Sequence, residues 1–366
     1  MYDENFNSQT IIFHTFAKNR KIRMTKLVAF TAAVGIVFIL TGCFNKKEYF
    51  EDSGTVFHTL YHIKYESHEL LTEKIDAELQ QFNLSLNPFN PNSIISKVNN
   101  NEPIEVDPWF KEVFTKSLEV SAATDGVFDI TCAPMVNLWG FGFNKMDSVT
   151  PQMIDSIKSF VGYQKIHLEG SRIVKDDPRV IINCSAIAKG YACDVIARLL
   201  EKEGVENYMV EIGGEVTMKG VNAQGDCWRI GINKPEDETT GMKNEVEEVV
   251  QLCKKGGVAT SGNYRNYYIK DGKKYAHTID PRTGYPAQQD ILSATVVADD
   301  CMTADAYATS FMAMGTKAMR KLVTKTKGIE YFIIYTDSIG NQQIEYSKGM
   351  IPFLPNRQQL AILENP

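Results

Sequence analysis

The pattern of apolar and polar positions predicts both strands and helices. Residues 55–67, "TVFHTLYHIKYES", alternate in polarity as a half-buried strand does. Residues 67–82 change to helical spacing and place five apolar side chains on one face: Leu70, Leu71, Ile75, Leu79 and Phe82. Further helices are predicted over residues 108–123 and 150–161, the second beginning with a Thr-Pro cap.

The middle of the chain predicts a strand, a turn and a helix. An apolar strand ends at Ile182, and Ser185 is the expected N-cap of a helix. The apolar face of that helix consists of Ile187, Tyr191, Val195 and Leu199. "NYMVEIGGEV" and "CWRIGIN" predict core strands, and Gly213-Gly214 marks a bulge or a close backbone approach. Residues 236–256 are charged and predict a surface insertion.

The last third of the chain predicts strands at residues 258–261, 264–270, 273–278 and 291–298. A helix from about Thr303, a second helix and the strand "IEYFIIYTD" follow. Helices and strands are not regularly interleaved, and the strands are not all contiguous. The expected fold class is therefore α+β rather than a doubly wound sheet.

The N-terminal region has the pattern of an export signal. Arg20, Lys21, Arg23 and Lys26 precede an unbroken run of apolar or small residues from Leu27 to Leu40. The run ends in Leu-Thr-Gly-Cys43, which resembles a bacterial lipoprotein signal site in which the Cys is lipidated and becomes the first residue. A simple membrane anchor and a buried core helix are the alternatives.

These features predict a division of the chain into four parts. Residues 24–42 are expected to be the signal peptide, residues 43–53 a tether, and residues 54–355 the globular domain. Residues 1–23 carry no such signal, and Met24 is an alternative start of the chain.

Charge excludes one class of partner. The 366-residue chain has a formal net charge of −6, and the part after the signal is more negative still. It contains no basic stripe or run, so we expect no binding to nucleic acid. Because the chain is negative, an anionic ligand would need local positive potential from a metal ion or a helix N-terminus.

The cysteines give no sign of a disulfide framework. Apart from Cys43, six cysteines remain, and their spacings include no CxxC. Disulfides are chemically possible outside the cytoplasm. We nevertheless expect these cysteines to act mostly as buried small hydrophobic residues: Cys132, Cys184, Cys193, Cys227, Cys253 and Cys301.

Asp305 and Thr309 form the first candidate constellation. Four residues apart on a predicted helix, their oxygens face the same side. A carboxylate with a hydroxyl suits Mg²⁺, which accepts few protein carboxylates and completes its shell with phosphate and water. The structural alternative is an Asp that offsets the helix dipole and a Thr that bonds back to a carbonyl.

Two further stretches could carry chemistry. In "NCSAIAKG", N–H groups at Ser185 to Ile187 would suit an anion at a helix start, with Lys189 close by, although an ordinary capped helix explains the pattern too. In "HTIDPRTGYP", His277 precedes rigid turn chemistry, and a half-buried hairpin His is the simpler interpretation. No Walker loop, GxGxxG after a strand, HExxH or GxSxG is present.

Six stretches together resemble the ApbE family of bacterial FAD:protein FMN transferases. They occur in the family's order and extend over residues 53 to 340 approximately: "GVFDITCAPMVNLWGFG", "SAIAKGYACDVIARLLEKEG", "VEIGGEV", "ATSGNYRNYY", "HTIDPRTGYP" and "ADAYATSFMAMG". The resemblance implies two α+β subdomains, duplicated and T-fold-like, with FAD held between them. It also implies Mg²⁺-dependent transfer of the FMN half of FAD to a Thr or Ser hydroxyl of a partner protein, with release of AMP.

The resemblance also implies roles for individual residues. Asp305, Thr309 and the backbone carbonyl of Ala186 match the family's metal ligands, and His277 matches its proposed general base. The residues implied in FAD contact are Phe89, Val127, Phe128, Asp129, Asn183, Ser185, Lys189 and Ile279. Two positions depart from the family pattern: Phe57-His58-Thr59 replaces Met-Gly-Thr, and Asn183 stands where an Asp is common.

Two other functions remain open at this point. A FAD pyrophosphatase would use the same metal site, with water replacing the acceptor and FMN and AMP as products. A non-catalytic FAD-binding lipoprotein would need neither His277 nor the metal ligands, yet all are present.

By resemblance, the expected acceptor is a subunit of a membrane redox complex, such as the Na⁺-pumping quinone reductase or an Rnf-type complex. The expected location is the cell envelope. There Cys43 would anchor the protein by lipid, at the periplasmic face of the inner membrane.

Overall fold

The computed structural model describes residues 46–141, 149–235, 245–262, 267–270, 273–276 and 278–357. Met1–Glu48 form one unit and Tyr49–Pro366 form another, and the fold below is that of the second. The predicted signal peptide and Cys43 lie outside the described residues. In the part of the chain that the structure describes, no helix has the length and apolarity needed to cross a membrane.

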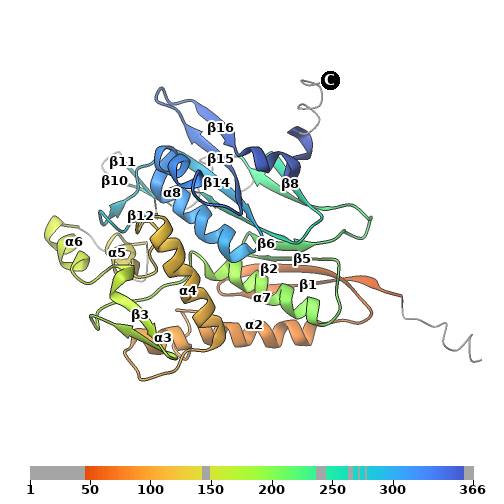
Figure 1. Ribbon diagram of the computed structural model, residues 1–366, viewed down its shortest axis with the longest axis horizontal. Helices are drawn as coiled ribbons and strands as arrows, with labels where there is room; N and C mark the ends of the chain where they lie inside the picture. The colour runs from red at the N-terminus through yellow and green to blue at the C-terminus, as the bar shows by residue number, and fades with distance from the viewer. Residues whose placement is uncertain are drawn as a thin grey trace, which may run out of the picture. The chain divides into compact units, whose positions relative to one another are not determined.

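One eight-stranded sheet organises the fold, with its strands in the order β1-β2-β5-β6-β9-β14-β15-β16 (Figure 1). From β2 to β16, each neighbouring pair is antiparallel. The strands are β1 (Glu48–Val56), β2 (Thr59–Ser67), β5 (Tyr208–Ile212), β6 (Glu215–Lys219), β9 (Gly256–Gly262), β14 (Ile291–Ala298), β15 (Ile329–Thr336) and β16 (Gln342–Tyr346).

The sheet consists of two halves that repeat one order of elements. In the first half, β1 and β2 are followed by helices and then by β5 and β6. In the second half, β9 and β14 are followed by α8 (Cys301–Val323) and then by β15 and β16. Helix α8 is itself broken at Gly315, whose φ of 72° and ψ of 170° are not helical. The α+β prediction is confirmed, and β6 and β9 join the two halves edge to edge.

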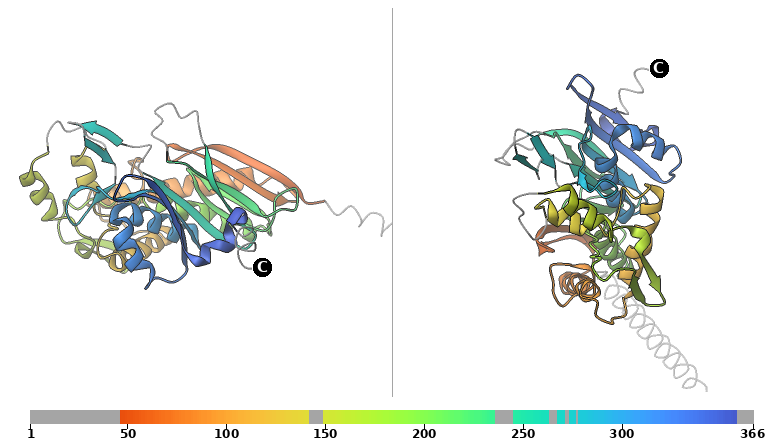
Figure 2. Two further views of the ribbon diagram at one scale, coloured as in Figure 1. Left: turned by 90° about the horizontal axis from the view of Figure 1, so that it is seen from above. Right: turned by 90° about the vertical axis from the view of Figure 1, so that its left-hand side faces the viewer.

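The helices lie mainly against one face of the sheet, where α7 (Ala188–Lys202) and α8 run side by side (Figures 1 and 2). The other helices are α2 (Thr72–Leu86), α3 (Ile94–Asn99), α4 (Pro108–Ala123), α5 (Ala133–Leu138) and α6 (Pro151–Lys158), with 3₁₀ turns η1 (Tyr163–Lys165) and η2 (Lys348–Phe353). Four small two-stranded sheets complete the fold: β3 (Ile166–Glu169) with β4 (Arg172–Lys175), β7 (Trp228–Asn233) with β8 (Val246–Leu252), β10 (Tyr267–Lys270) with β11 (Lys273–Ala276), and β12 (Ile279–Asp280) with β13 (Tyr285–Pro286).

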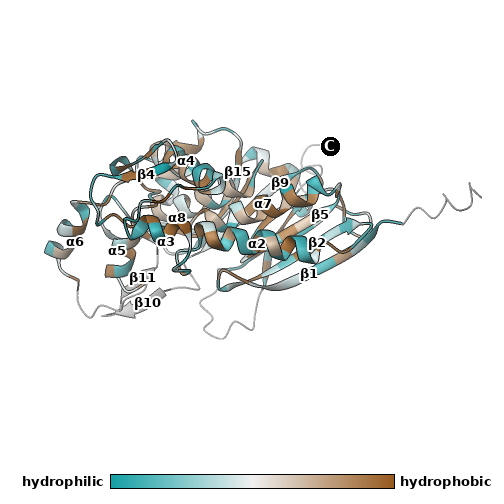
Figure 3. Cartoon of the chain, turned by 90° about the horizontal axis from the view of Figure 1, so that it is seen from below, coloured by the Kyte–Doolittle hydropathy of each residue, from teal (hydrophilic) through white to brown (hydrophobic). Residues whose placement is uncertain are grey.

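The sheet has a separate apolar core on each face. Because successive strand residues point to opposite faces, Val296 and Ile333 pack toward the helices, while Val297 and Ile334 pack toward the β7–β8 hairpin and η2. Hydrophobic residues follow α7 and α8 in Figure 3, whereas the edge strand β1 is mostly pale or hydrophilic. The helix-side core is the larger of the two and surrounds the contact between α7 and α8.

Helices α7 and α8 are held together by carboxylates that cap each other's N-termini. Asp305 of α8 accepts the Gly190 N–H of α7 at 3.0 Å. In return, Asp194 of α7 accepts the N–H groups of Cys301 and Met302 at 3.0 and 2.8 Å. Both carboxylates therefore satisfy helix-end donors that would otherwise be buried without partners.

Several local predictions between residues 55 and 187 are wrong. The alternating stretch 55–67 is a hairpin rather than one strand, because the chain turns at Phe57 and His58, whose φ values are 51° and 61°. The apolar segment ending at Ile182 joins no sheet, since its backbone bonds to the Asn99 side chain. Ser185 is not an N-cap, because α7 begins at Ala188 with Ile187 in the cap position.

The cysteine and insertion predictions also need correction. Cys227 and Cys253 form a disulfide across the ends of β7 and β8, so they are not unpaired. The other four are free thiols, and of these only Cys132 is not fully buried. Residues 246–252 of the expected surface insertion form β8, whose Val250 and Leu252 are buried. Residues 236–244 lie outside the described part.

We expect Gly190→Ala to destabilise the protein. A Cβ at this position would lie 2.3 Å from the Cys301 carbonyl oxygen and 2.8 Å from the Asp305 Cβ, so α7 and α8 would have to separate. Overpacking of this kind costs about 1–3 kcal/mol of unfolding free energy. Chemical denaturation measures the loss, and Lys202→Ala, at an exposed position of the same helix, is the control. Equal stability of the two variants would contradict the tight contact.

Candidate active site

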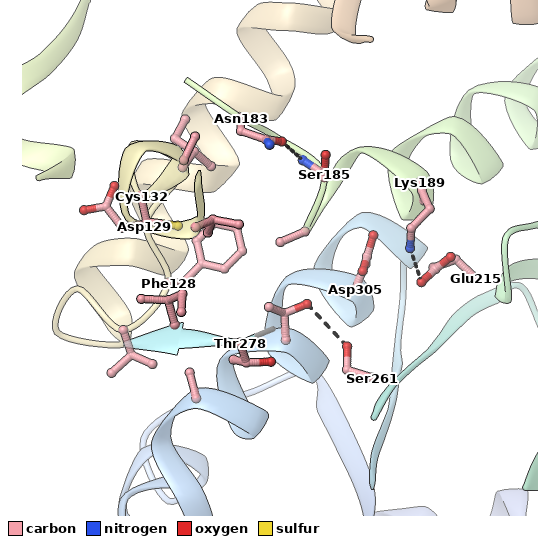
Figure 4. A pocket seen from close by; sticks show the side chains of 18 of the residues that line it. Phe128, Asp129, Cys132, Asn183, Ser185, Lys189, Glu215, Ser261, Thr278 and Asp305 are labelled. Atoms are coloured by element: carbon pink, nitrogen blue, oxygen red, sulfur yellow. Dashed lines mark hydrogen bonds and ion pairs between the residues drawn. The ribbon is translucent and has the colours of Figure 1, made fainter. Parts of the chain in front are cut away.

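Ten of the twelve residues singled out from the sequence line one cavity of about 580 Å³ beside α7 and α8 (Figure 4). They are Val127, Phe128, Asp129, Asn183, Ser185, Ala186, Lys189, Ile279, Asp305 and Thr309. They come from segments spread over 180 residues of sequence, so the fold brings together what the sequence separates. The other two, Phe89 and His277, are considered below.

Helix α8 contributes oxygen atoms to the cavity. Asp305 is 2% exposed, and within the described part of the chain its one hydrogen bond is the one from Gly190 to Oδ2. Thr309, one turn further on, is half-buried, and its hydroxyl lies 3.3 Å from that of Ser261 on β9. The alternative role for Asp305, a first-turn Asp that offsets the helix dipole, does not apply because α8 begins at Cys301 and its first turn contains no acidic residue.

The turn that leads into α7 offers fewer donors than predicted. The Ser185 N–H donates to Asn183 Oδ1 at 2.8 Å, and the Ile187 N–H donates to the Cys184 carbonyl at 3.0 Å. The expectation that both groups are free for an anion is therefore wrong. In the first turn of α7, the Ala188 N–H donates to the Cys184 carbonyl at 2.8 Å and the Gly190 N–H donates to Asp305 at 3.0 Å. What this turn presents to the cavity includes Ala186, the predicted carbonyl ligand.

Lys189 and two buried carboxylates form the charged part of the cavity. The Lys189 ammonium is paired with Oε1 of Glu215, a side chain that is 4% exposed at the start of β6. Burial lowers the pKa of Lys189, but attraction to Asp305 and Glu215 outweighs it and raises the pKa overall. Burial also raises the pKa of Asp305 and of Glu215, against the influence of Lys189. Two carboxylates thus share one ammonium, which leaves the cavity short of positive charge.

The opposite wall is made by the loop after α4. Val127 and Phe128 are 4% and 3% exposed, and their apolar surface lines the cavity. The Asp129 carboxylate is occupied within the loop, because Oδ1 accepts the Thr131 N–H and hydroxyl while Oδ2 accepts the Tyr163 N–H. Asp129 therefore shapes the wall rather than offering a free charge to a ligand.

A second cavity of about 370 Å³ adjoins the first. The two have Ser185, Lys189 and Gly213 in common, so they meet at the start of α7. Phe89, which is 51% exposed, lies here rather than in the larger cavity, and its ring meets that of His58 edge-on with centroids 5.3 Å apart. The unusual Phe57-His58 pair also lines this cavity.

Sequence similarity then decides the family. The ApbE family model matches residues 57–333. The chain is 36% identical over 332 residues to the FAD:protein FMN transferase of Haemophilus influenzae, covering 86% of this chain and 95% of that protein. It is 37% identical over 295 residues to the enzyme of the same name from Vibrio cholerae, covering 77% and 86%. The chain belongs to the ApbE family.

Solved structures of ApbE proteins have the same fold. The flavin transferase ApbE from Vibrio cholerae superposes with a TM-score of 0.75 at 34% identity, covering 84% of this chain and 100% of that one. The apo form of the flavinyl transferase ApbE from Pseudomonas stutzeri gives a TM-score of 0.74 at 27% identity, covering 84% and 97%.

One predicted site residue lies outside the described part of the chain, and residues that were not predicted also line the cavity. His277 lies outside the described residues, although the next two residues, Thr278 and Ile279, line the cavity. Sequence reasoning missed Glu215, Ser261 and Thr260, which also line it. Glu215 follows the Gly213-Gly214 pair, and that close backbone approach was the available signal.

We expect Asp129→Asn to loosen the cavity wall. The amide nitrogen of Asn would face an N–H or hydroxyl donor, which leaves a buried donor unpaired and costs about 1–3 kcal/mol of unfolding free energy. Thermal unfolding measures the change. Asp125→Asn is the matched control, because Asp125 is exposed and its φ of 53° suits Asn. If both variants melt like the parent, the carboxylate does not hold the loop.

Proposed function

We propose that this protein transfers the FMN moiety of FAD to a Thr or Ser hydroxyl of a partner protein, with Mg²⁺, and releases AMP. The observation that carries the proposal is the cavity lined by the three predicted metal ligands and seven of the eight predicted flavin-contact residues, in a chain of the ApbE family. Its relatives are named FAD:protein FMN transferase.

The shape of the site supports a dinucleotide substrate. FAD has two ring systems joined by a pyrophosphate, and the two adjoining cavities would accept one ring system each. Their shared residues, Ser185, Lys189 and Gly213, would then lie beside the pyrophosphate. The backbone of Gly213 permits close approach, since a Cβ there would lie 3.2 Å from the Lys189 Cδ.

The residues present fit a hard divalent cation. Asp305, Thr309 and the Ala186 carbonyl would hold Mg²⁺, which prefers oxygen ligands and shares its shell with phosphate and water. Among the described residues, no three His, Cys, Asp or Glu side chains converge as a softer metal would require. Bound Mg²⁺ would neutralise charge on the pyrophosphate and stabilise the AMP leaving group.

The reaction needs a base as well as bound substrates. The acceptor oxygen attacks the FMN phosphorus, the phosphorus–oxygen bond to AMP breaks, and the hydroxyl proton leaves. His277 is our candidate for the group that accepts this proton, because an imidazole is largely neutral near pH 7. Phe128 and Val127 supply an apolar wall that would exclude water, which matters because water in place of the acceptor would give FMN and AMP instead.

We also propose that the protein is exported and anchored by lipid at Cys43, on the periplasmic face of the inner membrane. The signal pattern of residues 24–42 supports this. The Cys227–Cys253 disulfide supports it independently, since such bonds persist in oxidising compartments. The acceptor would be a subunit of a membrane redox complex, such as the Na⁺-pumping quinone reductase or an Rnf-type complex.

The decisive experiment mixes the purified protein with FAD, Mg²⁺ and a candidate acceptor domain. Flavin fluorescence on the acceptor band of a denaturing gel, with release of AMP, supports transfer. FMN and AMP in solution without labelled acceptor would indicate a pyrophosphatase instead. Bound FAD with no product would indicate a binding protein.

We expect Asp305→Ala to abolish transfer and to weaken FAD retention. The substitution removes the only carboxylate among the three proposed ligands of the cation. Gel fluorescence measures transfer, and FAD retention is measured by equilibrium dialysis with Mg²⁺. Ser310→Ala is the control, because this neighbouring hydroxyl on α8 donates to the Ala306 carbonyl inside the helix. Transfer by Asp305→Ala at the parent rate would refute the ligand assignment.

We expect His277→Ala to retain FAD but to lose most turnover. General-base catalysis contributes about 10²–10⁴ in rate, whereas FAD binding depends on other residues. Single-turnover transfer and FAD dialysis separate the two effects. The base assignment fails if this variant labels the acceptor as fast as the parent does.

A further inference from the structure

Glu215 is buried next to the proposed cation ligands, and neither the sequence motifs nor the proposed mechanism gives it a role. One of its oxygens, Oε1, is paired with Lys189, and the other, Oε2, is buried with no hydrogen-bond partner among the described residues. A buried carboxylate with an unpaired oxygen is costly, so its retention calls for a reason.

Lys189 lies within reach of two carboxylates. Its neighbour in the chain, Gly190, donates its N–H to Asp305, so the Lys189 side chain starts beside that carboxylate. The ammonium is nevertheless paired with Glu215, as Figure 4 shows. The negative charges of Asp305 and Glu215 each raise the pKa of Lys189. Both carboxylates therefore attract the same ammonium.

The backbone around Glu215 supports this pairing. Gly213 and Gly214 have φ values of 67° and 101°, which turn the chain sharply ahead of β6. The missing side chain at Gly213 leaves room for the Lys189 stem, whose Cδ would lie 3.2 Å from a Cβ there. The Lys189 side chain is still 33% exposed, and among the described residues Glu215 is the ion-pair partner that holds its charged end.

We propose that Glu215 is a positioning residue that holds the Lys189 ammonium away from Asp305 and so keeps Asp305 available to the divalent cation. Without Glu215, Lys189 would pair with Asp305 and occupy the position of the cation. The inference rests on the cation site of the proposed function, but it assigns a role to a residue outside that site's ligands.

The test is a double-mutant cycle with Mn²⁺ as the probe, because Mn²⁺ takes the same oxygen ligands as Mg²⁺ and free Mn²⁺ is measured directly by electron paramagnetic resonance. The proteins are the parent, Glu215→Gln, Lys189→Met and the double variant. We expect Glu215→Gln to weaken Mn²⁺ binding roughly tenfold or more, since an ion pair in a partly buried site exceeds the energy of one tenfold step.

The effect of Glu215→Gln with and without Lys189 distinguishes competition by the Lys189 ammonium from a simple loss of negative charge. In the Lys189→Met background, we expect Glu215→Gln to change the Mn²⁺ dissociation constant by less than about threefold, because no ammonium is left to compete. If Glu215→Gln weakens binding by the same factor in both backgrounds, Glu215 acts through its charge or as a direct ligand, and the inference is wrong.

Two further variants test whether the effect requires a negative charge at residue 215 and whether it is specific to the cavity. Glu215→Asp retains the charge and should bind Mn²⁺ nearly as the parent does, whereas a loss as large as that of Glu215→Gln would contradict the inference. Glu201→Gln is the matched control, because Glu201 pairs with Lys219 and Lys255 outside the cavity, and it should leave Mn²⁺ binding unchanged. Melting temperatures establish that each variant is folded.

The outcome separates this inference from the proposed function. A parent protein that binds Mn²⁺ and shows the background effect, yet labels no acceptor, would refute the transferase and leave the role of Glu215 intact. If the parent transfers FMN while Glu215→Gln binds Mn²⁺ as tightly as the parent does, the transferase is supported and the role of Glu215 is refuted. A parent that binds no Mn²⁺ would overturn the inference together with the cation site.

Discussion

The reciprocal capping of α7 and α8 is the constraint on which the site depends. Asp194 fixes the start of α8, and Asp305 fixes the start of α7. Gly190 allows the contact, since any side chain there would meet the Cys301 carbonyl. Because the two helices belong to different halves of the sheet, this contact sets the distance between the residues that each half contributes to the cavity.

Much of the fold and of the candidate site could be predicted from the sequence, where the pattern depends on neighbouring residues or on a motif. Strand β14 and helix α4 have the bounds that periodicity indicated, because a buried strand and a capped amphipathic helix depend on their own residues. Asp305 and Thr309 share a helix face for the same reason. Motif resemblance brought in positions such as Asn183 and Ile279, which no period connects.

Other features depend on contacts that no local pattern records. Ile182 follows an apolar run typical of a strand, yet its backbone partner is the side chain of Asn99, 83 residues away. Ser185 has the residue type of an N-cap, but Asp305 from another helix takes the donor at the helix start. Cys227 and Cys253 pair because β7 and β8 are adjacent, and the charged stretch before β8 conceals that strand. In each case tertiary structure overrides a local preference.

The same capping explains how an acidic protein could hold an anionic dinucleotide. Donors of the kind that bind phosphate at helix starts are used internally here, the Gly190 N–H of α7 by Asp305 and the Cys301 and Met302 N–H groups of α8 by Asp194. Among the described residues that line the cavity, Lys189 supplies the one ammonium, and Glu215 neutralises it. The face left to a ligand is therefore rich in oxygen, which attracts a cation and repels a bare phosphate. In the proposed function, the pyrophosphate of FAD would therefore be held chiefly through a shared divalent ion, with Asp305 as its single carboxylate anchor.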